Sequence, residues 1–323
     1  MTRNRKYAST LTCAAVVVLA GAVFTADVSA GPPESKVLLN GQPVAVFFND
    51  GDSFRVLRGR MKGAKARLAG FNTLESHGPV HQWGDWTVKE MYVLAKMATL
   101  HARRGVWECT SDGKTDTYGR MLTYCPGLAE ELIRLGYAHA LTVTDEPADP
   151  RYLAAQKEAQ DNKRGIWAHG VPKFVVTSLH SVEEDLEGKG TYNRTVSTED
   201  GHSIMWRHTT RYKECENVCK MEYPVNDNAV AQVVTELKAD DAAAALIEGL
   251  SDEALTKGVR DFAAYRHVDR EIPKERRWKL VKYLDGYMSA GKFGPEATGE
   301  PISCMVHIEF KRRYGTGKAA CLK

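Results

Sequence analysis

Residues 67–75 read RLAGFNTLE and join an apolar strand to a polar loop. The strand is expected over residues 66–71; Asn72 follows it directly, and Glu75 stands in the loop just beyond. A carboxylate just past a strand end, such as that of Glu75, can take a proton from water. The guanidinium of Arg67 can hold a phosphate through two parallel hydrogen bonds, which a lysine cannot do. The stretch therefore indicates a β-rich fold with phosphate chemistry at the end of one strand.

The sequence upstream of this stretch continues as short strands separated by turns. Residues 44–48 and 53–57 are strand-like, and the NDGD segment between them is a strong turn signal. Asp50 and Asp52 place two carboxylates at this turn, and hard oxygen ligands of this kind suit Ca²⁺ or Mg²⁺. Residues 55–67 add six basic side chains and no acidic one. Ligands for a cation and groups for a phosphate are thus close together in the sequence.

Downstream, helical and strand-like segments alternate with short loops. The expected helices span residues 85–103, 129–135 and 150–163, and the expected strands span residues 105–110, 120–124 and 137–143. Short strands in this number, with a helix after the third, are compatible with an OB-type barrel. The loop at 111–119 carries Tyr118 and leads into Arg120, a second arginine suited to phosphate.

Four short motifs occur in a fixed order: DGDS at 50–53, RLAGFNTLE at 67–75, YGR at 118–120 and GIW at 165–167. Together they resemble the motifs of the staphylococcal nuclease (thermonuclease) family, and the resemblance covers residues 37–168. The resemblance implies an α+β fold in which a five-stranded OB-fold β-barrel carries packed helices. It also implies Ca²⁺-dependent endonuclease activity on DNA and RNA.

The resemblance carries catalytic roles onto individual residues of this sequence. Arg67 and Arg120 would hold and stabilise the transition state of phosphodiester hydrolysis, and Glu75 would activate the attacking water. Tyr118 would lie near a substrate phosphate.

The implied metal site is where this sequence departs most from the family. Asp52 would be a metal ligand, and Thr73 would offer its backbone carbonyl. Asn72 stands where the family has a second ligating aspartate. An amide oxygen binds Ca²⁺ without contributing charge, so we expect weak Ca²⁺ affinity and a tolerance for Mg²⁺ or Mn²⁺. Leu74 replaces the family's proline, which loosens the loop that aims Glu75.

Two functions from different classes are consistent with these residues. The retained Arg67, Glu75 and Arg120 favour a metal-dependent nuclease that hydrolyses phosphodiester bonds of DNA and/or RNA. The alternative is a catalytically impaired OB-fold module that binds nucleic acid or protein. Thr142 and Thr144 favour the alternative, because they stand where the type member has tyrosines that stack on the nucleotide.

The first 30 residues have the layout of a secretory signal peptide. Three basic residues precede an uncharged, mostly apolar run over residues 11–26, and Val28-Ser29-Ala30 supplies the small residues of a cleavage site. The run is shorter than the roughly 20 residues that a membrane-spanning helix needs. We therefore expect cleavage after Ala30, a secreted or periplasmic protein, and no stable membrane insertion. Cleavage lowers the formal net charge from +3 to +1.

Six of the seven cysteines remain after the leader, and an even number in an exported chain favours disulfides. Cys109 and Cys125 fall on the two strands that flank the loop leading into Arg120, so a disulfide between them is predicted. The sequence leaves the pairing of the others open; they are Cys215, Cys219, Cys304 and Cys321.

Residues 171–323 contain no motif that assigns a function, and the region is expected to be mixed but largely helical. Its 23 basic and 24 acidic residues do not indicate a second nucleic-acid surface. A third possibility is that this region is the functional part, an envelope interaction domain with the nuclease-like region as its scaffold. The expected elements are helices at 212–221, 227–247, 252–265 and 274–289, a hairpin formed by 192–198 and 203–208, and a strand at 302–310.

Overall fold

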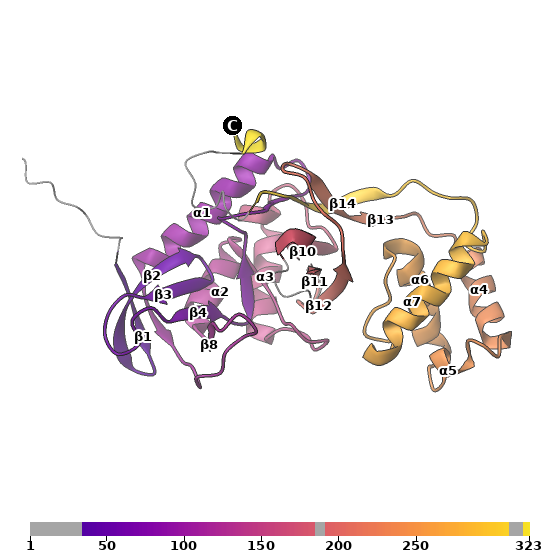
Figure 1. Ribbon diagram of the computed structural model, residues 1–323, viewed down its shortest axis with the longest axis horizontal. Helices are drawn as coiled ribbons and strands as arrows, with labels where there is room; N and C mark the ends of the chain where they lie inside the picture. Colours follow the sequence, from indigo (N-terminus) through magenta and orange to yellow (C-terminus); the bar gives the residue numbers. More distant parts are fainter. Residues whose placement is uncertain (1–33, 185–190, 310–318) are drawn as a thin grey trace, which may run out of the picture. The chain divides into compact units, whose positions relative to one another are not determined.

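The computed structural model describes residues 34–184, 191–309 and 319–323, so the predicted leader lies outside the described residues. Over these ranges the protein is a mixed α+β structure (Figure 1). Its strands are β1 (Ser35–Leu39), β2 (Gln42–Asp50), β3 (Ser53–Val56), β4 (Lys65–Leu68), β5 (Phe71–Thr73), β6 (Val80–Gln82), β7 (Val106–Cys109), β8 (Met121–Thr123), β9 (Ala138–Ala140), β10 (Phe174–Ser178), β11 (Thr191–Ser197), β12 (Ser203–His208), β13 (Asn217–Glu222) and β14 (Glu300–Val306). Its α-helices are α1 (Val88–Arg104), α2 (Pro126–Arg134), α3 (Pro150–Asp161), α4 (Asp227–Ala239), α5 (Ala244–Ile247), α6 (Asp252–Tyr265) and α7 (Lys274–Ser289).

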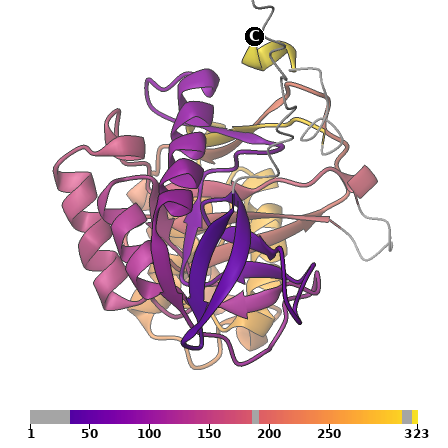
Figure 2. The ribbon, with the colours of Figure 1, turned by 90° about the vertical axis from the view of Figure 1, so that its left-hand side faces the viewer.

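The largest sheet has the strand order β7-β1-β2-β3-β4-β8. Strands β1 to β4 form an antiparallel meander, and β7 and β8 extend it on either side through parallel pairing. The inward side chains of β2 and β3 include Phe48 and Phe54, which are fully buried and pack edge to face. Helix α1 lies against these strands through small residues, among them Ala98 and Ala102 (Figure 2). The sheet and α1 thus position the loops at the ends of β2, β4 and β5.

Helix α1 begins three residues later than its apolar spacing predicts. Thr87 is the N-cap, and its hydroxyl accepts a hydrogen bond from the backbone N–H of Glu90. The Glu90 carboxylate in turn accepts from the backbone N–H of Thr87 at 2.9 Å, which completes a capping box. The cap fixes the start of the helix and leaves Trp86 outside it, where its indole N–H donates to the carbonyl of Ile166.

The predicted disulfide between Cys109 and Cys125 is confirmed. It joins the end of β7 to the residue before α2, and the neighbouring Thr110 and Tyr124 are bridged by backbone hydrogen bonds. The covalent link closes the loop that carries Tyr118 and Arg120.

Replacing both cysteines by alanine (Cys109→Ala with Cys125→Ala) should lower the free energy of unfolding by about 3 kcal/mol, because the unfolded chain regains the entropy of an open loop of about 15 residues. Equilibrium urea unfolding of the exported protein measures the change, and the other two disulfides remain in both forms. An unchanged unfolding midpoint and slope would show that this disulfide does not stabilise the hairpin.

A second sheet joins the two halves of the sequence. Its order is β13-β14-β6, so that β6, from the first half, pairs with β14 near residue 306. The prediction of one helix over 212–221 is wrong, because β13 forms there instead. Cys215 has a left-handed backbone (φ 64°) that ends any helix, and Cys219 lies opposite Cys304 in the β13–β14 register. Disulfides link Cys219 to Cys304 and Cys215 to Cys321, which resolves the pairing left open by the sequence.

The remaining elements form a third sheet, with order β10-β11-β12, and a helical bundle. Helices α4, α6 and α7 bury Val233, Phe262 and Leu284 against one another. The segment predicted as one helix over 227–247 is two helices. Asp240 ends α4, and its carboxylate accepts from the backbone N–H of Ala242. No helix among the described residues is both long and apolar enough to cross a membrane.

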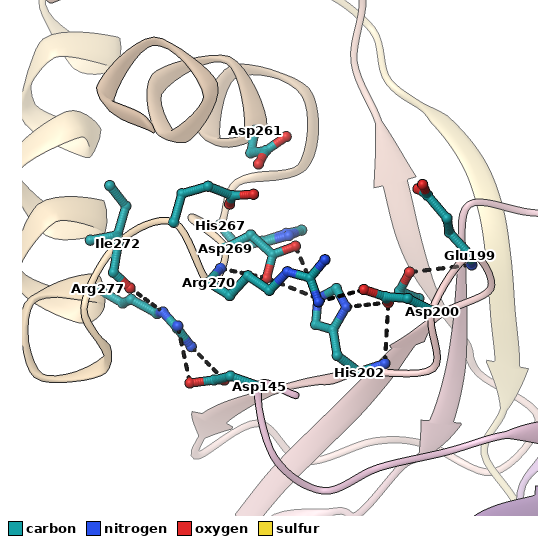
Figure 3. A network of polar contacts seen from close by, with 12 residues as sticks. Asp145, Glu199, Asp200, His202, Asp261, His267, Asp269, Arg270, Ile272 and Arg277 are labelled. Atoms are coloured by element: carbon teal, nitrogen blue, oxygen red, sulfur yellow. Dashed lines mark hydrogen bonds and ion pairs between the residues drawn. The ribbon is translucent and has the colours of Figure 1, made fainter. Parts of the chain in front are cut away.

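A group of buried and half-buried charges connects the bundle to the β11–β12 turn and to the loop before α3 (Figure 3). We call it the polar latch. The imidazole of His202 lies between two carboxylates, with Nδ1 2.5 Å from Asp200 Oδ1 and Nε2 2.9 Å from Asp269 Oδ1. Its members are Asp145, Asp200, His202, Asp269, Arg270 and Arg277. Burial alone would lower the pKa of His202, but the two carboxylates outweigh burial and raise its pKa to about 9.

Candidate active site

The structure brings together four of the residues that the sequence predicts for the site. Arg67, on β4, places Nη1 2.5 Å from Asp52 Oδ1 and donates from Nη2 to Asn72 Oδ1 at 2.6 Å. The backbone N–H of Thr73 donates to Asp52 Oδ2 at 2.9 Å. The turn between β2 and β3 and the strand β5 therefore meet at the end of β4. Their roles in metal binding and catalysis stay predictions.

Gly51 allows this close approach. A Cβ atom at that position would lie 2.5 Å from Cγ2 of Thr73 and 3.0 Å from Cβ of Ala98, so a side chain would push the turn away from β5. The side chains of Asp52 and Asn72 are buried at the junction, with 3% and 4% of each residue exposed. Such residues keep one arrangement because each polar atom there has a partner.

Asn72 uses both ends of its amide. Its Oδ1 accepts from Arg67, and its Nδ2 donates to the Thr73 carbonyl at 2.7 Å. That carbonyl is the oxygen that the resemblance assigns to the metal. An aspartate at position 72 could not donate this hydrogen bond. The neutral amide of Asn72 therefore provides the Thr73 carbonyl with a partner, a role that the resemblance assigns to the cation.

Three carboxylates surround the guanidinium of Arg67. Burial, and then the charges of Asp52 and Glu75, raise the pKa of Asp50 well above its usual range. Burial opposes the charged form of Arg67, but Asp52, Asp50 and Glu75 raise its pKa, so the guanidinium stays charged. One arginine is shared among acids that repel one another, which is the electrostatic setting of a cation-binding site.

The residues present fit a divalent cation. Asp50 Oδ1 is buried without a hydrogen-bond partner among the described residues, and it lies at the same turn as Asp52. A buried carboxylate oxygen with no partner is costly unless a cation or water satisfies it. Asp50, the first aspartate of the DGD turn, therefore stays a candidate ligand beside Asp52, as the sequence suggested.

Arg120 and Tyr118 lie on the neighbouring loop, which a single carboxylate organises. Asp116 Oδ1 accepts from the backbone N–H groups of Tyr118 and Arg120, both at 2.9 Å, and its Oδ2 accepts from Arg120 Nε at 2.7 Å. The guanidinium of Arg120 also lies 5.5 Å from the centre of the Tyr118 ring. Asp116 is thus a positioning residue, and it stands two residues before the first residue of the YGR motif.

Residues 65–169 match the family described as staphylococcal nuclease homologue. This stretch is a staphylococcal nuclease domain. The match includes Arg67, Glu75 and Arg120, whereas Asp50 and Asp52 precede it. A comparison with curated proteins found no match to the chain. The nuclease domain of this family has an OB-fold, and the three disulfides are typical of an oxidising compartment.

Proposed function

We propose that the protein is a secreted or periplasmic metal-dependent nuclease that hydrolyses phosphodiester bonds in DNA or RNA. The observation that carries this proposal is the junction at the end of β4, where Arg67 is held between Asp52 and Asn72 with two further acids around it. Arg67 is half-buried, so part of its guanidinium can still reach a phosphate while a cation neutralises the acids around it. We further propose that residues 37–168 form the five-stranded OB-fold barrel of this nuclease domain and that 171–323 form a C-terminal region joined to it.

The residues divide the chemistry among them. Arg67 presents its guanidinium, fixed by Asp52 and Asn72, to a phosphate oxygen of the substrate. Arg120, held through Nε by Asp116, offers the other nitrogens of its fork to the same phosphate. Glu75 takes the proton of the attacking water. Asp50, Asp52 and the Thr73 carbonyl would hold Ca²⁺, Mg²⁺ or Mn²⁺, which neutralises phosphate charge when bound.

Incubation of the purified protein with plasmid DNA and with RNA tests the proposal. Cleavage in the presence of Ca²⁺, Mg²⁺ or Mn²⁺ that stops on addition of EDTA supports a metal-dependent nuclease. Binding of both nucleic acids without cleavage under any of these metals would favour the alternative, a catalytically impaired OB-fold module. The hydrogen bond from Asn72 to the Thr73 carbonyl is the observation that favours this alternative.

Replacing Asn72 by aspartate should tighten Ca²⁺ binding by roughly tenfold, because the new side chain adds a charge and releases the Thr73 carbonyl. Without Ca²⁺ the same variant should melt at a lower temperature than the parent, since another acid then faces the carboxylates of Asp50 and Asp52. Calorimetric titration and melting curves measure both effects. Equal Ca²⁺ affinity in the two proteins, or binding in neither, would remove the metal from this mechanism.

A further inference from the structure

We propose that the β11–β12 hairpin extends the substrate surface of the nuclease domain and binds a single-stranded segment of the nucleic acid beyond the cleavage site. This inference rests on the proposed function, since it assigns a second part to the same substrate. The hairpin lies in the C-terminal region, outside the stretch that matches the nuclease family.

The hairpin touches the candidate active site directly. The hydroxyl of Tyr192, on β11, lies 3.1 Å from the hydroxyl of Tyr118. Tyr118 belongs to the loop of Arg120, and the residue is 60% exposed. A substrate that passes Arg120 and Tyr118 therefore meets Tyr192 next, although the two tyrosines are 74 residues apart in the sequence.

One face of the hairpin carries aromatic and basic side chains together. In the antiparallel register Tyr192 lies opposite Arg207, and Arg194 lies opposite Met205. The guanidinium of Arg194 lies 5.7 Å from the centre of the Tyr192 ring, and its Nη1 donates to Ser203 Oγ at 2.6 Å. Alternating strand residues share a face, so these side chains form one continuous surface.

The opposite face of the hairpin is buried and fixes which side faces outward. Thr191, Asn193 and Thr195 alternate with the residues above, and each is at most 5% exposed. The Asn193 amide donates to the Tyr212 hydroxyl at 2.8 Å, and the Thr191 hydroxyl donates to the His208 carbonyl at 2.7 Å. The buried face is thus fixed by hydrogen bonds of Thr191 and Asn193, and the aromatic and basic side chains lie on the other side of the hairpin.

The turn between β11 and β12 also lies against the segment of Thr142 and Thr144, where the resemblance leads one to expect tyrosines. The backbone N–H of Thr142 donates to the Gly201 carbonyl at 2.8 Å, and that of Ala148 donates to the Asp200 carbonyl at 2.8 Å. Gln156, on α3, donates to the Thr198 carbonyl at 2.7 Å. The C-terminal region therefore packs on the segment in which Thr142 and Thr144 replace the two tyrosines. It also carries Tyr192 at the other end of the β11–β12 hairpin.

The chemistry of this face selects the ligand. Tyr118 is 60% exposed, whereas Tyr192 is half-buried with the His180 ring 4.9 Å from its own, centre to centre. The accessible part of a tyrosine ring can stack on a base only when that base is unpaired, and arginines pair with the phosphates between the bases. Arg120, Arg194 and Arg207 supply positive charge along this path, even though the C-terminal region as a whole carries a formal charge of −1. The occupant is therefore a single strand of DNA or RNA.

The test measures binding without cleavage. A fluorescein-labelled oligothymidylate and a duplex of the same length are titrated in EDTA, and fluorescence anisotropy gives Kd. Tyr192→Ala should weaken binding of the single strand by roughly tenfold, since one lost stacking contact is worth about 1–3 kcal/mol. Tyr192→Phe keeps the ring and should stay within about twofold of the parent. Arg194→Gln should make the slope of log Kd against log salt concentration shallower by about the value of one phosphate contact.

The matched control is Trp278→Ala, which removes an aromatic side chain from α7 that is 63% exposed and belongs to neither site. Equal affinities for the parent, Tyr192→Ala and Arg194→Gln would overturn the inference, as would a parent that binds neither ligand. Equal weakening by Tyr192→Ala and Tyr192→Phe would assign the effect to the hydroxyl pair and also overturn base stacking. Plasmid cleavage by the parent with Ca²⁺ is scored separately, so a failed nuclease assignment stays distinguishable from a failed binding surface.

Discussion

Replacing Glu75 by glutamine will lower phosphodiester hydrolysis by roughly 10²–10⁴ while the fold is retained. Glutamine keeps the size and the hydrogen-bonding capacity of the side chain but cannot take a proton from water. The charge of Glu75 acts on both Asp50 and Arg67, so its side chain belongs to the junction at the end of β4. Initial rates of plasmid nicking at saturating Ca²⁺ measure the effect, and circular dichroism checks the fold.

Arg120→Lys should also reduce the rate strongly, because a planar fork becomes a point charge. Its Nε contact with Asp116 is lost in the same change. Glu253→Gln, an exposed carboxylate in the first turn of α6, serves as the control and should cleave at the parental rate. If Glu75→Gln and Arg120→Lys both digest DNA as fast as the parent, the reaction does not take place at this site.

Replacing His202 by alanine should destabilise the protein by about 3–5 kcal/mol, because the carboxylate of Asp269 loses its cation and Asp200 keeps only Arg270. His202 is only 4% exposed, and its ring contacts Asp200 and Asp269 at the same time. Equilibrium urea unfolding at pH 6 measures the loss. Lys279→Gln, which changes an exposed cation of α7 outside the polar latch, should leave the unfolding midpoint unchanged.

The polar latch also predicts how the difference in unfolding free energy between the parent and His202→Ala depends on pH. The pKa of His202 is about 9 in the folded protein against about 6.5 unfolded, so its contribution is complete below pH 6.5 and is lost as the pH rises through 9. At the acid end, burial would raise the pKa of Asp269, but His202 lowers it to about 2, so that contribution is lost as the pH falls from about 4 to 2. The gap between parent and His202→Ala should therefore be widest near pH 4–6.5.

The stability of the parent alone would not show the effect of His202, because Lys220 also titrates in this region. The parent must therefore be compared with His202→Ala at each pH. Burial lowers the pKa of Lys220 to about 7, and its Nζ contacts the Tyr265 carbonyl and His267 Nδ1, each at 2.8 Å. A lowered lysine pKa increases stability as the pH rises above 7, which opposes the effect of His202. Lys220 is present in both proteins, so the difference between them isolates His202. A gap that does not shrink between pH 6.5 and 9 would show that His202 is not charged in the latch.

The sequence predicted the features that depend on local pattern. Apolar spacing located α6 and α7, and the EDG turn located the β11–β12 hairpin. The resemblance to the staphylococcal nuclease family also implied that Arg67, Asp52 and Asn72 belong to one site, and their side chains are in contact. The disulfide between Cys109 and Cys125 followed from its position across one loop.

Contacts between distant segments could not be predicted in the same way. Residues 212–221 were expected to be helical, but pairing with β14 outweighed the local pattern and made a strand of 217–222. His202 gave no signal in the sequence, because its partner Asp269 is 67 residues away. The contact between Tyr118 and Tyr192 was hidden for the same reason. In each case the energy comes from tertiary packing and charge, which no short window of sequence contains.

The pairing of β6 with β14 has a consequence for the order in which the protein acquires its structure. Val80 faces Val306, so more than two hundred residues separate the two strands. At ordinary rates of translation, roughly 10–50 s pass between the synthesis of the first strand and that of its partner. During this interval the backbone groups of β6 that later pair with β14 have no strand opposite them, and such groups can pair with strands of other chains. A fragment that stops at residue 169 would never gain this partner strand, so we expect the isolated nuclease domain to aggregate where the longer chain stays monodisperse in size-exclusion chromatography.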